Sequence, residues 1–205
     1  MEFYEAVKQR RTVRDFEEKE VPGDVLKRIL EAGLQAPSGD HLREIEYVVI
    51  RGRTHIASVL GEVSKGASAQ LESVKASSMK GAQREMYLDA VPKQFRMLSG
   101  SGCLVLPFYR QSGDLLHPKT QSSLNAFASV WCTVENILLA AAAEGLACSL
   151  RVPIGDEQKY AAAAVQAPPG YVMPCYLGIG YPAKEAAVLK QVDINIEEKI
   201  HTDTW

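Results

Sequence analysis

The stretch SLNAFASVWCTVENILLAAAAEG, residues 123–145, contains the most apolar run of the sequence and decides what kind of fold the chain adopts. A helix that begins at Ser122 or Ser123 and ends at Glu144 spans about 22 residues, or roughly 33 Å. A serine at the start and Gly145 after the end are typical of helix boundaries. The apolar side chains cover more than one narrow stripe, which predicts a helix buried on most sides, in a core or a subunit interface.

Helices and strands alternate on both sides of this long helix. The expected helices are one ending near Gln9, 22–35 and 156–165, and the expected strands are 46–52, 102–109, 147–156 and 175–182. Residues 54–99 carry thinly spread apolar side chains and predict surface helices with a poorly determined middle at 64–81. Without an internal repeat or a low-complexity linker, the pattern predicts a single α+β domain around a modest sheet of about four strands.

The composition is that of a globular protein with a sizeable core. The chain has 205 residues, 46% of them hydrophobic and 23% charged, and a formal net charge of −2. No overall field therefore favours nucleic acid or an anionic membrane, and any basic site must be local. The run NILLAAAAEGL, 136–146, is interrupted by Glu144 and is shorter than the roughly 20 residues of a membrane span, so no membrane span is expected.

The four cysteines predict a reduced, cytoplasmic protein. They are widely separated, form no CxxC pair and lie among apolar neighbours, so all four are expected to be buried; they are Cys103, Cys132, Cys148 and Cys175. The first residues include Glu2 and Glu5 and lack the apolar run of a secretory signal. A cytoplasmic location follows by default.

Positive charge is concentrated in QRRTVRDF, residues 9–16. Arg10, Arg11 and Arg14 around Thr12 are typical of a phosphate or carboxylate site, because guanidinium groups bind such anions bidentately and a hydroxyl donates one more hydrogen bond. The alternative is that the arginines complement the dipole at the end of a short helix. The segment by itself leaves both interpretations open.

A second polar motif, APSGDH at 36–41, follows the second predicted helix. Ser38 and the backbone of Gly39 and Asp40 could present donors and acceptors to a polar ligand. The same residues are also the standard ones of a turn, so the motif alone leaves this choice open as well.

Other common catalytic patterns are absent from the sequence. Gly100 and Gly102 precede a strand, whereas a dinucleotide-binding fingerprint follows one and has a third glycine. The four histidines are not spaced as metal ligands, and no serine lies in a GxSxG elbow. We therefore predict no metal and no catalytic side chain.

Taken in order, the motifs resemble the FMN-dependent nitroreductase family over nearly the whole chain. They are RRTVRDF (10–16), APSGD (36–40) before EYVVI (46–50), ILLAAAAEGL (137–146), RVPIGD (151–156) and PPGYVMPCYLGIGYPA (168–183). The resemblance implies one α+β domain over 1–205, with a central, mostly antiparallel sheet surrounded by helices. It also implies an intertwined homodimer with two FMN sites at the interface. Such proteins pass a hydride from NADH or NADPH through FMN to a small acceptor, such as a nitroaromatic, quinone or enone, by a ping-pong mechanism.

Carried over residue by residue, the resemblance assigns the cofactor contacts. They are Arg10, Arg11, Thr12, Arg14, Pro37, Ser38, Gly39, His41, Pro153, Ile154, Gly155 and Lys190. The arginine segment would contact the phosphate and ribityl chain, and Pro37–Gly39 would reach the flavin of the other subunit. Pro153–Gly155 would run along the isoalloxazine ring, with a backbone N–H near its reactive nitrogen. Lys190 lies near the position of a basic phosphate ligand in many members. Because the flavin carries the hydride chemistry, no catalytic side chain is required.

The sequence departs from the family after the serine loop. Many members have an asparagine, one residue and then Gln-Pro-Trp, whereas residues 41–45 read HLREI and place His41 at the asparagine. Flavin affinity or the pocket over the ring is therefore expected to differ, and segments 54–99 and 112–120 are expected to shape that pocket. The alternative function is a flavin- or small-ligand-binding protein without turnover, a carrier or sensor. Reductive dehalogenation and flavin fragmentation also occur on this fold, and nothing in the sequence selects them.

Overall fold

The computed structural model describes residues 1–187 and 191–205, and its centre is an antiparallel sheet. Among the described residues the sheet has five strands in the order β1-β2-β5-β3, with β4 paired to β2. The strands are β1 Ile45–Ile50, β2 Cys103–Arg110, β3 Ala147–Arg151, β4 Tyr171–Val172 and β5 Tyr176–Gly180. The pairings between them are antiparallel, which confirms the predicted α+β fold. The two-residue strand β4 was not predicted.

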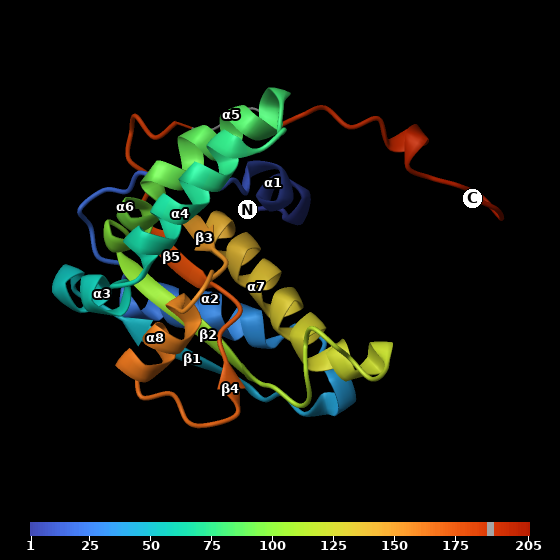
Figure 1. Ribbon diagram of the computed structural model, residues 1–205, viewed down its shortest axis with the longest axis horizontal. Coiled ribbons are helices and arrows are strands. Elements are labelled where there is room, and N and C mark those ends of the chain that lie inside the picture. The colour runs from blue at the N-terminus through green and yellow to red at the C-terminus, as the bar shows by residue number, and fades with distance from the viewer. Residues whose placement is uncertain (188–190) are drawn as a thin grey trace.

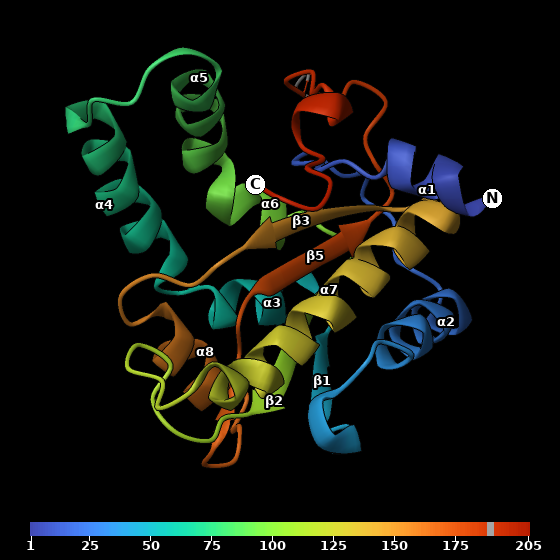
Figure 2. The ribbon, with the colours of Figure 1, turned by 90° about the vertical axis from the view of Figure 1, so that its right-hand side faces the viewer.

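Helices cover both faces of the sheet (Figures 1 and 2). They are α1 Phe3–Gln9, α2 Gly23–Leu34, α3 Arg53–Val59, α4 Val63–Ala76, α5 Gly81–Ala90, α6 Gln94–Ser99, α7 Asn125–Ala143 and α8 Glu157–Ala164. Short 3-10 turns are η1 Gly39–His41, η2 Val91–Lys93, η3 Gln121–Leu124 and η4 Ile196–Glu198. The segment 54–99 is helical as predicted, but its middle is an ordinary helix, α4, followed by a short turn.

Strand β2 separates two hydrophobic cores. Cys103 and Val105 face the core that contains α2 and α7, whereas Leu104 and Leu106 face the core that contains α3, α6 and α8. Successive side chains of a strand point to opposite faces, so one apolar run supplies both cores. This explains why β2 reads as a continuous apolar segment and not as an alternating one.

Helix α7 lies across one face of the sheet beside α2, as Figure 2 shows. It ends before Gly145, whose φ of 74° fits the predicted glycine stop. The predicted serine cap is wrong: η3 precedes α7, and the Ser123 hydroxyl donates to the carbonyl of Thr120.

The outer face of α7 is only partly covered. Cys132 on that face is exposed, so the prediction that all four cysteines are buried is wrong for this one. The helix is apolar on so many sides that its sequence does not reveal which side meets the core.

Two of the other cysteines are buried on strands, as predicted. Burial raises the pKa of the Cys103 thiol to about 11 and that of the Cys148 thiol to about 12.

By length and composition alone, the helical stretch Gln121–Ala143 could cross a membrane. The apolar run 136–146 is too short to span a bilayer, but the whole helical stretch is long enough, so the prediction of no membrane span does not follow from length. The core helix of a globular protein has the same length and composition. Here the inner side of α7 packs against α2 and the sheet, with Val134 and Ile137 in the core.

Two glycines of β5 are required by packing. A Cβ on Gly178 would lie 2.6 Å from the Ser149 hydroxyl oxygen, and one on Gly180 would lie 2.8 Å from the backbone nitrogen of Gly102. Glycine within a strand indicates the close approach of backbone or of a ligand, and here protein atoms make that approach.

Candidate functional site

The arginine segment leaves α1 and runs beside β3. Arg10 caps the helix with an extended ψ of 116°, which turns the chain away from the helix axis. Val13 is then buried, and its N–H donates to the Cys148 carbonyl at 3.0 Å, while Thr12 forms an isolated β-bridge with the same residue. The backbone thus anchors the segment to β3, and the side chains of Arg11, Thr12 and Arg14 lie half-buried around this anchor.

The three guanidinium groups have different surroundings. Arg10 Nε lies 3.7 Å from a carboxylate oxygen of Glu135 on α7, and Arg11 Nη1 donates to the Arg10 carbonyl at 2.7 Å. Arg14 Nε is buried and has no hydrogen-bond partner in the described part of the chain. A buried, unsatisfied donor costs about 1–3 kcal/mol, which a bound anion would relieve. Arg14 also lies beyond the last turn of α1, where the helix dipole no longer acts.

Pro153–Gly155 follows β3 after Val152, and the arginine segment contacts β3 at Cys148, so two of the three predicted cofactor segments meet this strand. Cys148, which pairs with Val13, precedes Pro153 on one short stretch of chain. Gly155 has a φ of 55°, a left-handed conformation that glycine adopts without strain. The structure therefore brings the arginine segment and this loop to β3.

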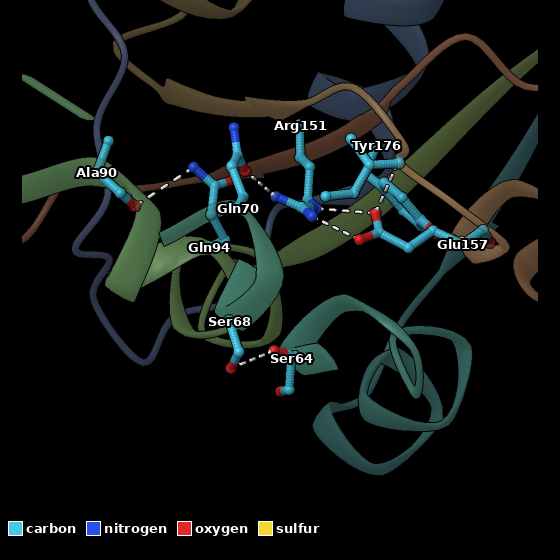
Figure 3. A network of polar contacts seen from close by, with 9 residues as sticks. Ser64, Ser68, Gln70, Ala90, Gln94, Arg151, Glu157 and Tyr176 are labelled. Atoms are coloured by element: carbon cyan, nitrogen blue, oxygen red, sulfur yellow. Dashed lines mark hydrogen bonds and ion pairs between the residues drawn. The ribbon is translucent and has the colours of Figure 1, made fainter. Parts of the chain in front are cut away.

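A buried ion pair, which the sequence analysis missed, underlies this loop (Figure 3). The side chains of Arg151 and Glu157 are 2% and 1% exposed, and Arg151 Nε donates to Glu157 Oε2 at 2.9 Å. Arg151 also reaches Gln70 on α4 at 3.4 Å, and the Tyr176 hydroxyl donates to the Glu157 carbonyl at 3.0 Å. The signal in the sequence was an arginine at the end of an apolar strand and a glutamate shortly after VPIG.

The third segment, Pro37–Gly39, is held against the start of α7. The Gly39 N–H donates to the Ser129 hydroxyl at 2.9 Å, and that hydroxyl donates to the Asn125 carbonyl. A Cβ on Gly39 would lie 2.9 Å from the Asn125 Cβ, so the contact requires glycine. Ser129 and Asn125 are further site residues that the sequence analysis did not select, although both are polar interruptions of an apolar helix.

The backbone after this segment adopts unusual conformations. Asp40, His41 and Arg43 have φ values of 53°, 54° and 50°, a region that residues other than glycine rarely occupy. Such strain is concentrated at functional sites and persists only where the surroundings impose it. It falls on the stretch where the sequence departs from its apparent family.

A small pocket lies between this segment, the end of β2 and the start of α7. Its volume is about 100 Å³, and Ser38, Tyr109 and Asn125 are among its lining residues. Tyr109 is buried, and its hydroxyl has no partner within the described ranges. Burial raises the pKa of Tyr109 to about 12, so this phenol is a neutral donor at physiological pH.

Pro37–Gly39 and the arginine segment contact α7 at different places along the helix. Ser129, which holds Gly39, precedes Glu135, which contacts Arg10, by six residues of α7, or about 9 Å. In Figure 2 the segment between α2 and β1 lies at the opposite end of the molecule from α1. Lys190 lies outside the described residues. Among residues 1–187 and 191–205, no group of three or more His, Cys, Asp or Glu side chains could hold a metal.

Comparisons with known proteins give one matching family and several similar proteins. The model of a family described as the nitroreductase family matches residues 7–181. An iodotyrosine deiodinase from Nematostella vectensis is 26% identical over 196 residues, covering 91% of this chain and 69% of that protein. An NADH dehydrogenase from Thermus thermophilus is 26% identical over 201 residues, covering 88% of this chain and 86% of that protein.

A solved structure shares the fold. It is an oxidized iodotyrosine deiodinase bound to FMN and 3-iodo-L-tyrosine, with a TM-score of 0.77, 20% sequence identity and full coverage of both chains. At this level of identity the likeness concerns the architecture.

Proposed function

The chain belongs to the nitroreductase family, and on this premise we propose that it is an FMN-dependent oxidoreductase that takes a hydride from NADH or NADPH and passes it to a small organic acceptor. The observation that carries the proposal is that Arg14 Nε, in an arginine segment anchored to β3, is buried and has no hydrogen-bond partner among residues 1–187 and 191–205. Donor and acceptor would use the same face of the flavin in succession, which is a ping-pong mechanism.

The residues present fit FMN. A phosphate monoester carries a charge of about −1.5 to −2 at pH 7, and Arg10, Arg11 and Arg14 supply matching cations in one short segment. Guanidinium groups bind phosphate oxygens bidentately, and Thr12 offers a hydroxyl. Bound FMN would supply the hydride chemistry, while the chain binds and orients it. Pro153–Gly155, which follows β3, would hold the ring.

We propose that a second copy of the chain completes the site. Phe3 and Tyr4 on α1 are 63% and 84% exposed, and Cys132 lies on the partly uncovered face of α7. Figure 1 shows residues 191–205 extending away from the sheet, and Trp205 in this tail is fully exposed. Large exposed apolar surfaces mark interfaces. A homodimer would cover them and would bring Pro37–Gly39 of each chain to the other chain's flavin.

The dimer is tested by Cys132→Arg. Because this side chain is exposed in a single chain, an arginine there leaves the subunit fold intact but places a buried charge in the proposed interface. We expect the mass measured by light scattering to fall from twice the chain mass to 22.5 kDa, with loss of bound flavin. Ser68→Arg, at an exposed position of α4, is the control and should keep the dimer. A Cys132→Arg protein that keeps its mass and flavin would contradict the interface.

The redox function is tested by a visible spectrum with a reductant titration. We expect a yellow protein with flavin absorbance at about 450 nm. NADH or NADPH should bleach this absorbance anaerobically, and a quinone or nitroaromatic should restore it. A colourless protein that does not take up added FMN would contradict the proposal. Bound FMN that is reduced no faster than free FMN would instead favour a carrier or sensor.

Reductive dehalogenation is a second candidate reaction, because the similarity to the Nematostella deiodinase extends over 91% of the chain. Release of iodide from 3-iodo-L-tyrosine by the reduced protein would distinguish it from quinone or nitroaromatic reduction. Binding of that amino acid without iodide release would argue against this candidate.

A further inference from the structure

The Arg151–Glu157 pair closes the base of the loop that contains Pro153–Gly155. Glu157 Oε2 accepts from Arg151 Nε at 2.9 Å and from the backbone N–H of Ile154 at 3.4 Å, while Oε1 accepts from Arg151 Nη2. One carboxylate therefore contacts the last residue of β3 and the middle of the loop. The loop geometry depends on this side chain.

Stability alone does not account for such a pair. Two charges that are almost completely buried lose their hydration, and an apolar pair of similar volume usually stabilises a fold as well or better. What apolar side chains cannot provide is an acceptor for the Ile154 N–H. The hydrogen bond that depends on the ion pair lies within the segment proposed to face the flavin ring.

Helix α4 rests directly on the same pair. A Cβ on Gly66 would lie 1.9 Å from Glu157 Oε1 and 3.1 Å from Arg151 Nη2, so the α4 backbone lies against the charged groups. Glycine within a helix otherwise costs about 1 kcal/mol relative to alanine, and this close approach explains its presence. One turn further on, Gln70 accepts from Arg151 Nη1 at 3.4 Å, and Figure 3 shows the two side chains pointing toward each other.

We propose that Arg151 and Glu157 are positioning residues for the flavin. They fix the backbone of residues 153–155 against the ring, and Gly66 and Gln70 join α4 to that arrangement. Hydrogen bonds from the protein to ring nitrogens tune the electronics of a flavin, so the pair acts on the reduction potential through the loop it holds. This inference rests on the proposed FMN-dependent function.

The test compares two double variants that differ in one acceptor. R151M/E157L removes both charges and the acceptor for Ile154 N–H, whereas R151M/E157Q removes both charges and keeps an amide oxygen. We expect both to fold. R151M/E157L should bind FMN about 10-fold more weakly, with a shifted flavin midpoint potential and flavin reduction slowed by about 10- to 100-fold, because small misplacements of reacting groups have large kinetic effects. R151M/E157Q should recover most of all three properties.

The outcomes separate this inference from the function on which it rests. Wild-type protein without FMN binding would refute the function itself. Wild-type affinity and potential in R151M/E157L would overturn the positioning role, as would equal losses in the two double variants. If R151M/E157L does not fold, Gly66→Ala gives an independent test, because its Cβ displaces the Glu157 carboxylate. A folded Gly66→Ala protein with unchanged flavin potential would also overturn the proposal.

Discussion

Replacing Arg10 and Arg14 together by alanine will release FMN while the fold is retained. Each charge-assisted hydrogen bond contributes about 1.5–3 kcal/mol, so losing two such contacts weakens binding by about 100-fold or more. The fold should persist because the segment is anchored by the Val13 N–H on the Cys148 carbonyl. The Arg10–Glu135 contact, between partly exposed side chains 3.7 Å apart, contributes at most about 1 kcal/mol.

The measurement is the ratio of flavin to protein absorbance after gel filtration, together with circular dichroism. Arg28→Ala combined with Lys75→Ala is the matched control, because it removes two positive charges that are 51% and 53% exposed and lie outside the proposed site. The control protein should keep its flavin. Unchanged flavin content in the Arg10 and Arg14 variant would show that the phosphate binds elsewhere.

Replacing Glu157 alone by leucine will destabilise the protein by about 3–5 kcal/mol, because it leaves the Arg151 guanidinium buried without a counterion. Replacing both partners with apolar residues should restore most of this loss. Urea unfolding of the flavin-free protein measures the free energy of unfolding without a contribution from the ligand.

The exposed pair of Arg28 and Glu144 provides the matched control. It is also bidentate, with distances of 2.9 and 3.0 Å, but its side chains are 51% and 31% exposed. Glu144→Leu should therefore change stability by only about 1 kcal/mol or less. If Glu157→Leu loses no more stability than Glu144→Leu, water reaches Arg151 and the pair is not buried.

The main helices and strands could be predicted from the sequence because their periodicity and boundaries are local properties. Gly145 ends α7 as expected, and the apolar run of β2 forms a strand. Strand β4 was not predicted, because two residues are too few to show a periodicity. The exposure of Cys132 could not be predicted either, because a helix that is apolar on most sides does not indicate which side meets the sheet.

The candidate site also contains residues that could be predicted from the sequence and residues that could not. The arginine segment and Pro153–Gly155 are contiguous in sequence and could be selected by motif, although their roles stay predictions. The pairing of Arg151 with Glu157 depends on how the loop between them closes, which no local pattern specifies. The left-handed conformation of Asp40 likewise comes from its surroundings, because a residue other than glycine does not favour it.

The position of β3 at one end of the strand order has a consequence for the flavin-free protein. An edge strand exposes unpaired N–H and C=O groups that can template aggregation, and proteins protect such edges by covering them. Here the cover is the arginine segment itself, through the contacts of Thr12 and Val13 with Cys148. Because these are backbone contacts, the segment proposed to hold the cofactor shields this edge of the sheet whether or not FMN is bound.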